Sequence, residues 1–221
     1  MNHQIETRRD FLKRAAISVA AFPLLINCKS DATAQKSSES TLDLIKKNAL
    51  GLEGPGEWSG AKDAPANVSW KADMAKETDE GEPMIISGTV FEKDGKTVAP
   101  NVLIYLYHTD MYGIYGRKGD AHRHGKFRGW MLTDEKGRYE FRSIKPASYP
   151  NTTFAAHVHM TVTGKNFRED WIDSILFEGD KFLTQRERNE AGKKGGFQPI
   201  VKLEKGADGI LRATRDIQLM S

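Results

Sequence analysis

The stretch "MIISGTVFEKDGKTVAPNVLIYLYH", residues 84–108, decides the fold class. Two runs rich in β-branched and aromatic side chains, 84–92 and 97–108, flank a polar turn at Asp94-Gly95. Branched and aromatic side chains pack well on a pleated surface, and glycine accepts the backbone dihedral angles of a tight turn. The pattern therefore predicts two strands joined by a turn.

Three more runs of the same kind follow at short intervals. They are "RGWMLTD" (128–134), "RYEFRSI" (138–144) and "AAHVHMTV" (155–162), with a turn at Lys136-Gly137 between the first two. Short strands at this spacing predict an all-β chain folded as an antiparallel β-sandwich, rather than an α/β fold.

Helical patterns are few and short. One is predicted over 41–50, where Ser40 or Thr41 provides the cap. Another is predicted over 180–192, with Asp180 as its cap. We therefore expect one or two short helices beside the sandwich.

The first residues resemble an export signal. "TRRDFLKRAAISVAAFPLLINC" (7–28) has the pair Arg8 and Arg9, followed by an apolar run at 15–26. A membrane-spanning helix needs about 20 apolar residues, so this run is too short to be one. The basic pair is similar to that of twin-arginine signals, which export proteins already folded.

Cys28 is the only cysteine of the chain, and it ends this apolar run. "LLINC" resembles a lipoprotein cleavage box, in which Cys28 carries the lipid that attaches the domain to a membrane; the alternative is a free thiol in a discarded peptide. Localisation in the periplasm or cell envelope follows. We divide the chain into a signal peptide (1–27), a tether with a short helix (28–50) and one sandwich domain with an irregular, Gly- and Pro-rich start (51–221).

Composition excludes a nucleic-acid-binding protein. The chain has 221 residues, 29% of them charged, which suits one soluble domain with a substantial core. Without residues 1–27 it contains 29 Lys and Arg against 28 Asp and Glu, so no excess of positive charge exists to attract phosphates.

Two His-x-His pairs are candidates for metal binding. On a strand, His157 and His159 share one face while Val158 faces the other side, so both imidazoles can reach one ion. A structural role for these two histidines remains about as plausible as a ligand role at this point. His122 and His124 lie in a segment rich in glycine and charge, which we interpret as a surface loop without a metal role.

At this point the sequence resembles a family. In order, "GEPMIISGTVFEKDGKTVAPNVLIYLYHTDMYGIYG", "GWMLTDEKGRYEFRSIKPASYP", "AAHVHMTVTG" and "DSILFEGDKFL" are similar to the core of intradiol ring-cleavage dioxygenases. The likeness covers residues 80–185. It implies a non-haem iron(III) enzyme that splits a catechol with O₂, between the two hydroxylated carbons, into a muconate-type dicarboxylate.

The resemblance implies four Fe(III) ligands: Tyr115, Tyr149, His157 and His159. Tyr112 is the nearest competitor of Tyr115. The two tyrosines are also the predicted catalytic residues, because the catechol is expected to displace one tyrosinate, Tyr149. The chemistry agrees, since anionic phenolate oxygens favour Fe(III) and neutral imidazoles complete the set.

One position departs from the family pattern. Family members usually carry an arginine three residues before the first histidine, and this chain has Phe154 there. A cation near developing negative charge contributes several kcal/mol to catalysis, so we expect either a substitute, with Arg128, Arg142 or Arg168 as candidates, or a preference for bulkier, less charged catechols.

Two alternatives come from other classes. "GTVFEKDGKTVAPNVLIYLYHTD" followed by "TDEKGRYEFRSIKPASY" also resembles prealbumin-like sandwich modules, which bind without catalysis and in which Tyr139 and Phe141 pack inward. A zinc hydrolase using His157, His159 and a carboxylate such as Asp110 is the other alternative.

Overall fold

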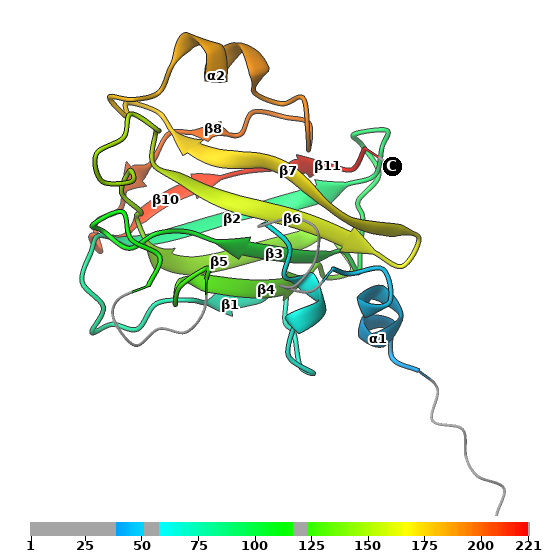
Figure 1. Ribbon diagram of the computed structural model, residues 1–221. Helices are drawn as coiled ribbons and strands as arrows, with labels where there is room; N and C mark the ends of the chain where they lie inside the picture. Colours follow the sequence, from blue (N-terminus) through cyan, green and yellow to red (C-terminus); the bar gives the residue numbers. More distant parts are fainter. Residues whose placement is uncertain (1–38, 51–57, 117–122, 221) are drawn as a thin grey trace, which may run out of the picture. The chain divides into compact units, whose positions relative to one another are not determined.

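Two β-sheets pack face to face in the part of the chain that the structure describes (Figure 1). The computed structural model describes residues 39–50, 58–116 and 123–220, and these belong to one unit, Ser38–Ser221. The predicted signal peptide, Cys28 and most of the tether lie outside the described residues. Among the helices in the described ranges, none has the length and apolar character needed to cross a membrane.

The first sheet is built around its longest strand, β2. In spatial order it contains β1 (Lys71–Asp73), β5 (Arg138–Ile144), β2 (Pro83–Phe91), β10 (Leu211–Thr214) and β9 (Glu204–Lys205), and β11 (Ile217–Gln218) also pairs with β2. β2 and β5 are antiparallel, as are β9 and β10, whereas β1 runs parallel to β5, and β10 and β11 run parallel to β2. The predicted antiparallel sandwich is thus confirmed at its centre and has parallel pairings toward its edges.

The second sheet carries the candidate site. Its strands are β4 (Arg128–Leu132), β3 (Leu103–Tyr107), β6 (His157–Gly164), β7 (Phe167–Phe177) and β8 (Ile200–Val201), in this order. The pairs β3–β4, β3–β6 and β6–β7 are antiparallel. In the β3–β6 pair, Tyr107 lies opposite His159, so the two side chains share a face.

The main core lies between the two sheets. Alternate residues of each strand point inward, and those of β2, β3, β5 and β6 are fully buried: Ile86, Ile104, Leu106, Phe141, Val158 and Met160. Tyr139 also packs inward as expected, and its hydroxyl donates to the carbonyl of Arg215. The other face of the second sheet is left for the N-terminal segment and for chemistry.

The N-terminal segment covers part of that outer face. The helix α1 (Thr41–Lys46) and the 3-10 turn η1 (Ala61–Asp63) pack against Leu103 and Tyr105 of β3. Ser40 caps α1 as predicted, because its hydroxyl accepts the N–H of Asp43. This arrangement agrees with the predicted irregular segment laid over the core.

Two elements begin later than predicted, and one strand was not predicted. The second helix, α2 (Gln185–Glu190), begins after a Thr184 cap rather than at Asp180. Thr184 and Glu187 form a reciprocal capping box, while the Asp180 carboxylate accepts the N–H of Ala156 and holds the start of β6. β3 begins at Leu103, six residues later than predicted. β7 was not predicted, because charged residues interrupt its apolar alternation.

Candidate metal centre

The outer face of β6 supplies two imidazoles. Val158 and Met160 are fully buried on the inner face, so the strand's alternation forces His157 and His159 to the outer one, where both are partly exposed. The buried inner residues fix the register, because a slip by one residue would turn both imidazoles into the core.

The hydroxyl oxygen of Tyr149 is the hub of a four-atom cluster. It lies 2.5 Å from the hydroxyl oxygen of Tyr115, 3.1 Å from His157 Nε2 and 3.3 Å from His159 Nε2. The two Nε2 atoms are 3.0 Å apart. The structure therefore brings together all four side chains that the sequence singled out as metal ligands.

The chemistry of these donor atoms fits a metal ion. His157 Nδ1 lies 2.7 Å from the carbonyl oxygen of Ala155, which only accepts, so Nδ1 carries the ring proton and Nε2 presents a lone pair. That lone pair faces His159 Nε2 and the Tyr149 oxygen. Ligand atoms that share one cation through bonds of about 2 Å come this close to one another. Two phenol oxygens favour a hard, highly charged cation.

Burial keeps the cluster's groups in their neutral forms. It lowers the pKa of His159 to about 3, and the neighbouring imidazoles add to the effect. Burial also lowers the pKa of His157 and raises the pKa of Tyr115. For Tyr149, burial raises the pKa, but the hydrogen bond with Tyr115 lowers it. The hydrogen bond between the two phenols thus acts on their pKa values in opposite directions, and it favours ionisation of Tyr149 over that of Tyr115.

A tight loop after β3 places Tyr115. The Asp110 carboxylate accepts the backbone N–H groups of Tyr112 and Ile114 at 2.8 and 3.0 Å, which closes the loop. Gly125, with φ +64°, passes so close that a Cβ there would lie 1.4 Å from the Tyr115 carbonyl oxygen. Tyr112 instead points away: it is 50% exposed, and its hydroxyl donates to a Glu80 carboxylate oxygen at 3.2 Å.

Tyr149 is tied to the same loop. The Ala147 N–H donates to the Asp110 carbonyl oxygen at 3.1 Å, and the Thr109 hydroxyl donates to the Ala147 carbonyl oxygen at 2.8 Å. The Thr152 hydroxyl donates to the carbonyl oxygen of Tyr149 itself at 3.0 Å. The two tyrosines, distant in sequence, therefore sit on one cross-linked pair of loops.

His124 is buried, contrary to our surface-loop interpretation. Its ring is 3% exposed and stacks on Tyr107 with ring centroids 3.7 Å apart, and its Nδ1 lies 2.5 Å from the Tyr105 hydroxyl oxygen. On its other side, Tyr107 stacks on His159 at 4.7 Å. Aromatic side chains from β3 bury His124 although its neighbours in the sequence are polar. The periodicity of the sequence could not reveal this contact, because the partners are distant along the chain. The companion His122 lies outside the described residues.

Other metal sets do not form in the described ranges. No group of three or more His, Cys, Asp or Glu side chains gathers there, so the zinc site that would combine His157, His159 and Asp110 is absent from them. Asp110 serves its own loop instead. The two phenol oxygens add to the two histidines and complete a set of four donor atoms.

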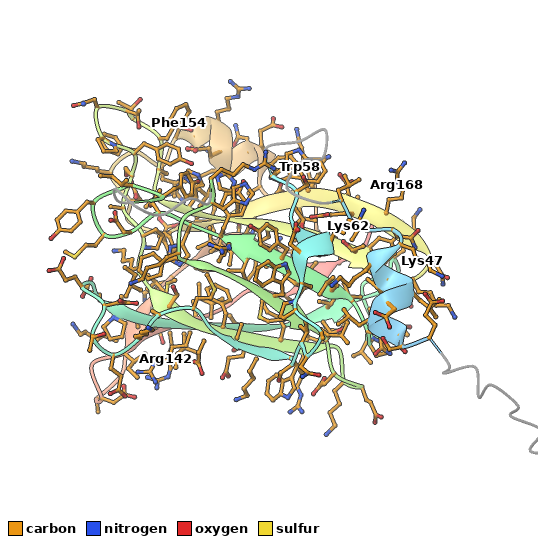
Figure 2. The ribbon with its side chains drawn as sticks, turned by 60° about the horizontal axis from the view of Figure 1, so that its bottom comes forward. Lys47, Trp58, Lys62, Arg142, Phe154 and Arg168 are labelled. Atoms are coloured by element: carbon orange, nitrogen blue, oxygen red, sulfur yellow. The ribbon has the colours of Figure 1, made fainter. Side chains whose placement is uncertain are left out.

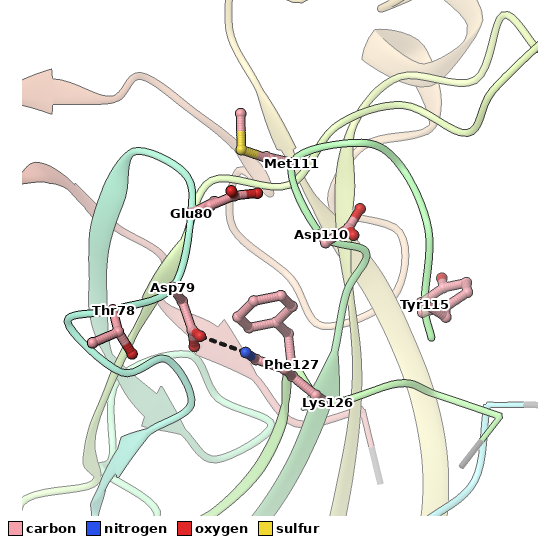
Figure 3. Close-up of a pocket in the computed structure, with 8 residues that line it drawn as sticks. All are labelled: Thr78, Asp79, Glu80, Asp110, Met111, Tyr115, Lys126 and Phe127. Carbon is pink, nitrogen blue, oxygen red and sulfur yellow. Dashed lines mark hydrogen bonds and ion pairs between the residues drawn. The ribbon is translucent and has the colours of Figure 1, made fainter. Parts of the chain in front are cut away.

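Three cavities adjoin the cluster. The first, of about 310 Å³, lies on the far side of Tyr115, where Lys126 pairs with Asp79 (Figure 3). The second, of about 640 Å³, opens on Tyr115, Tyr149 and His159, and its other lining residues are Trp58, Tyr107, Arg123, His124 and Trp171. The third, of about 240 Å³, opens on His157 and His159 from the side of β7 and α2. Trp171 lines both the second and the third cavity.

The three arginines predicted as substitutes lie at different places relative to the cluster. Arg142 belongs to the opposite sheet, and Arg168 lies near the far end of β7, beside the residue that pairs with Gly164 (Figure 2). Arg128 lies opposite Tyr107 and so shares the outer face of the sheet. The cation that lines the second cavity is Arg123, which sequence reasoning missed because it lies in the loop dismissed as surface.

Trp171 and Ser174 were also missed, because they belong to the unpredicted strand β7. The Ser174 hydroxyl lies 3.4 Å from His159 Nδ1. A signal for them exists in the sequence: Trp171 precedes the buried Ile172, and Ser174 precedes the buried Ile175, as on a strand with one face inward.

Comparison with known proteins places the chain in a family. The family described as "Dioxygenase" matches residues 53–209. The protocatechuate 3,4-dioxygenase beta chain of Burkholderia cepacia is 31% identical over 47% of this chain and 48% of its own length. Catechol 1,2-dioxygenase of Acinetobacter baylyi is 32% identical over 51% of this chain and 36% of its own length. The chain thus spans half or less of the length of these relatives.

Solved structures share the fold. The 3-chlorocatechol 1,2-dioxygenase of Rhodococcus opacus 1CP superposes with a TM-score of 0.55 at 19% identity, covering 75% of this chain and 69% of that one. The dioxygenase domain of a carbohydrate-binding fusion protein from Streptomyces sp. SirexAA-E gives 0.53 at 22% identity, covering 70% and 90%. Taken with the family match over most of the sandwich, the chain belongs to the intradiol dioxygenase family.

Proposed function

We propose that this protein is a non-haem Fe(III) intradiol dioxygenase that cleaves a catechol with O₂ to a muconate-type dicarboxylate. The observation that carries the proposal is the convergence of the Tyr115 and Tyr149 oxygens with Nε2 of His157 and His159, all joined by contacts of 2.5–3.3 Å. The family relatives named for catechol and protocatechuate cleavage support the reaction type.

Tyr115, Tyr149, His157 and His159 would hold the iron. Ferric iron, when bound, would draw electron density from a chelated catechol and so make its ring reactive toward O₂. The chain's own residues fix the ligand directions: Ala155 orients the His157 ring, and Tyr107 and Ser174 orient the His159 ring.

Tyr149 has a second role in this proposal, as the group that takes a proton from the catechol. Its oxygen is the hub of the cluster, and as an iron-bound phenolate it would accept that proton. A phenolate and a catechol hydroxyl belong to the same chemical class, so the proton passes between groups of similar basicity. Tyr115 is more deeply buried and hydrogen-bonded to Tyr149, which suits a ligand that stays in place.

Large aromatic walls support binding of a planar substrate. Trp58 and Trp171 line the 640 Å³ cavity that opens on three of the four donor residues, and Arg123 adds a positive charge to the lining. Aromatic side chains exclude water and stack on a catechol ring, and a cation favours its anionic form. A plain binding module offers no reason for two phenols and two imidazoles to converge beside such a cavity.

We also propose that residues 1–27 direct export and that a lipid on Cys28 anchors the domain in the periplasm or cell envelope. The Arg8-Arg9 pair, the short apolar run and the position of Cys28 support this proposal. The domain division at residues 27 and 50 belongs to the same proposal.

One experiment tests the enzymatic proposal. Purified protein reconstituted with Fe(III) is expected to show a visible tyrosinate-to-iron charge-transfer band and to convert catechols under O₂ into ring-opened dicarboxylates. Reconstitution with Zn²⁺ is the matched control, because zinc has no redox chemistry and gives no such band. A colourless iron-treated protein that leaves every catechol intact would overturn the proposal.

A further inference from the structure

The third cavity is a groove between β7 and α2 that begins at the proposed iron ligands. His157 and His159 line its inner end, and its apolar walls come from Phe154, Trp171, Leu176, Ala191 and Pro199. Its volume is about 240 Å³. A ring held at the histidines would therefore have room for a substituent that extends along this groove.

Phe154 is the exposed wall of the groove. It is 63% exposed, more than the other large apolar side chains of the described residues, and its ring stands edge-on to Tyr149 with centroids 6.4 Å apart. Figure 2 shows it beside α2. Together with Trp171 and Leu176 it forms a contiguous apolar lining, and a contiguous apolar surface, unlike a single exposed ring, marks a binding site.

The charges of the groove are negative. Asp173, Glu187 and Glu190 line it, and among the described residues no lysine or arginine does. Lys193 pairs with Glu190 at 2.6 Å, and the charge of the buried Arg215 acts on Asp173, so Glu187 is the carboxylate that sets the sign. Lys194 approaches Asp170 at 3.9 Å rather than lining the groove. A carboxylate entering here would lose its hydration and be repelled by a like charge. An uncharged alkyl group has neither penalty.

The second cavity has a different lining, in which Arg123 is the charged side chain among the residues that the structure describes. The groove and the second cavity meet at His159 and Trp171, which line both. We therefore expect a catechol whose ring lies in the second cavity to extend its substituent past Trp171 into the groove.

We propose that the substrate class is catechols bearing an uncharged apolar substituent, which the β7–α2 groove binds, and that the groove rejects carboxylated catechols. This inference rests on the proposed function, because it assumes that a catechol binds at the four donor residues. Phe154, Trp171 and Leu176 supply the apolar contact, and Glu187 supplies the discrimination.

The test is equilibrium binding to the iron-loaded full chain under argon, where no O₂ is present for turnover. Three probes are compared: catechol, 4-isobutylcatechol and 3,4-dihydroxyphenylacetate, the last two being nearly identical in shape but different in charge. The isobutyl compound is expected to bind about tenfold or more tightly than catechol, since each buried methylene contributes about fourfold. The acetate is expected to bind more weakly than catechol.

Two variants separate the apolar and the electrostatic contributions. Phe154→Ala is expected to weaken isobutylcatechol binding about fivefold or more and to leave catechol binding unchanged. Glu187→Gln keeps the capping hydrogen bond of α2 and removes the charge, so it is expected to strengthen acetate binding severalfold without affecting isobutylcatechol. Glu135→Gln, at an exposed position outside the groove lining, is the control and is expected to change nothing.

The outcomes are distinguishable. Binding of the acetate as tightly as the isobutyl compound would overturn the substrate class while leaving the dioxygenase proposal intact. Failure of iron-loaded protein to bind any of the three catechols would overturn the dioxygenase proposal, and this inference with it.

Discussion

Nε2 of His157 lies 3.0 Å from Nε2 of His159, with their ring planes at 85° to each other. His157 keeps its ring proton on Nδ1, so its Nε2 presents a lone pair, which the Nε2–H tautomer of His159 or a cation can satisfy. A hydrogen bond between the two rings serves only these two nitrogens. A metal ion satisfies both nitrogens, and the two nearby phenol oxygens as well.

Removing one phenol oxygen should therefore weaken metal binding. Tyr115→Phe and Tyr149→Phe keep the ring packing and delete one donor, so each is expected to lower iron affinity by at least tenfold and to weaken the visible charge-transfer band. Iron content per chain and the absorption spectrum measure the effect. Tyr112→Phe is the matched control, since its hydroxyl contacts Glu80 outside the cluster. Equal loss in the control would argue against the assignment of Tyr115.

Gly125 should be required for the site more than for the fold. An alanine Cβ there would lie 1.4 Å from the Tyr115 carbonyl oxygen, so Gly125→Ala is expected to displace Tyr115 and abolish iron binding while the sheets persist. Gly179→Ala is the control, because Gly179 has a similar positive φ of +84° but nothing within 4 Å of the added Cβ. Circular dichroism and iron titration compare the two. Iron affinity reduced equally in both variants would contradict the role given to this close approach.

Glu169 should stabilise the attachment of the N-terminal segment. Its carboxylate is buried and accepts the N–H groups of Leu50, Gly60 and Ala61 and the hydroxyl of Thr161. Glu169→Ala leaves these donors without their acceptor, so the free energy of unfolding is expected to fall by about 3 kcal/mol or more in urea titrations.

The control for this change is Glu178→Gln. Glu178 pairs with Arg188 at the surface, and exposed pairs contribute only about 0–1 kcal/mol. If Glu169→Ala proves no more destabilising than this surface change, the carboxylate does not hold the segment.

Acidification should destabilise the metal-free fold through His108. Burial lowers its pKa to about 4, and its ring links the Thr109 carbonyl to the Ser143 hydroxyl with contacts of 2.7 Å. Between pH 6.5 and 4 the unfolded chain binds the proton and the folded chain does not, so stability falls as pH falls through this window, by roughly 3 kcal/mol at most. Urea titrations of metal-free wild type and His108→Gln at pH 7 and pH 4.5 measure this effect. The variant is expected to show a smaller decrease, and equal decreases would assign the pH dependence to other groups.

Export should depend on the paired arginines. Replacing both Arg8 and Arg9 with lysine keeps the charge but removes the feature by which twin-arginine signals are recognised, so the protein is expected to accumulate in the cytoplasm. Cell fractionation followed by immunoblotting measures this, with Lys13→Arg as the control that leaves the pair intact. Unchanged export of the doubly substituted chain would refute the signal assignment.

The sequence by itself determined β2, β4, β5 and β6 and the face that carries the histidines. Alternation is local: once Val158 and Met160 are buried, the residues between and beside them must point outward. The turn residues similarly fixed the ends of β2 and β5. For this reason the all-β sandwich and the position of His157 and His159 on one strand could be predicted.

Only the tertiary structure decided which side chains meet. Tyr115 rather than Tyr112 joins the cluster because Asp110 folds its loop and Gly125 lets the chain pass. His124 is buried because Tyr105 and Tyr107 of another strand cover it. Such contacts join residues far apart along the chain, and no local period encodes them. The charges of the β7–α2 groove arise in the same way, from segments that come together only when the two sheets and α2 are in place.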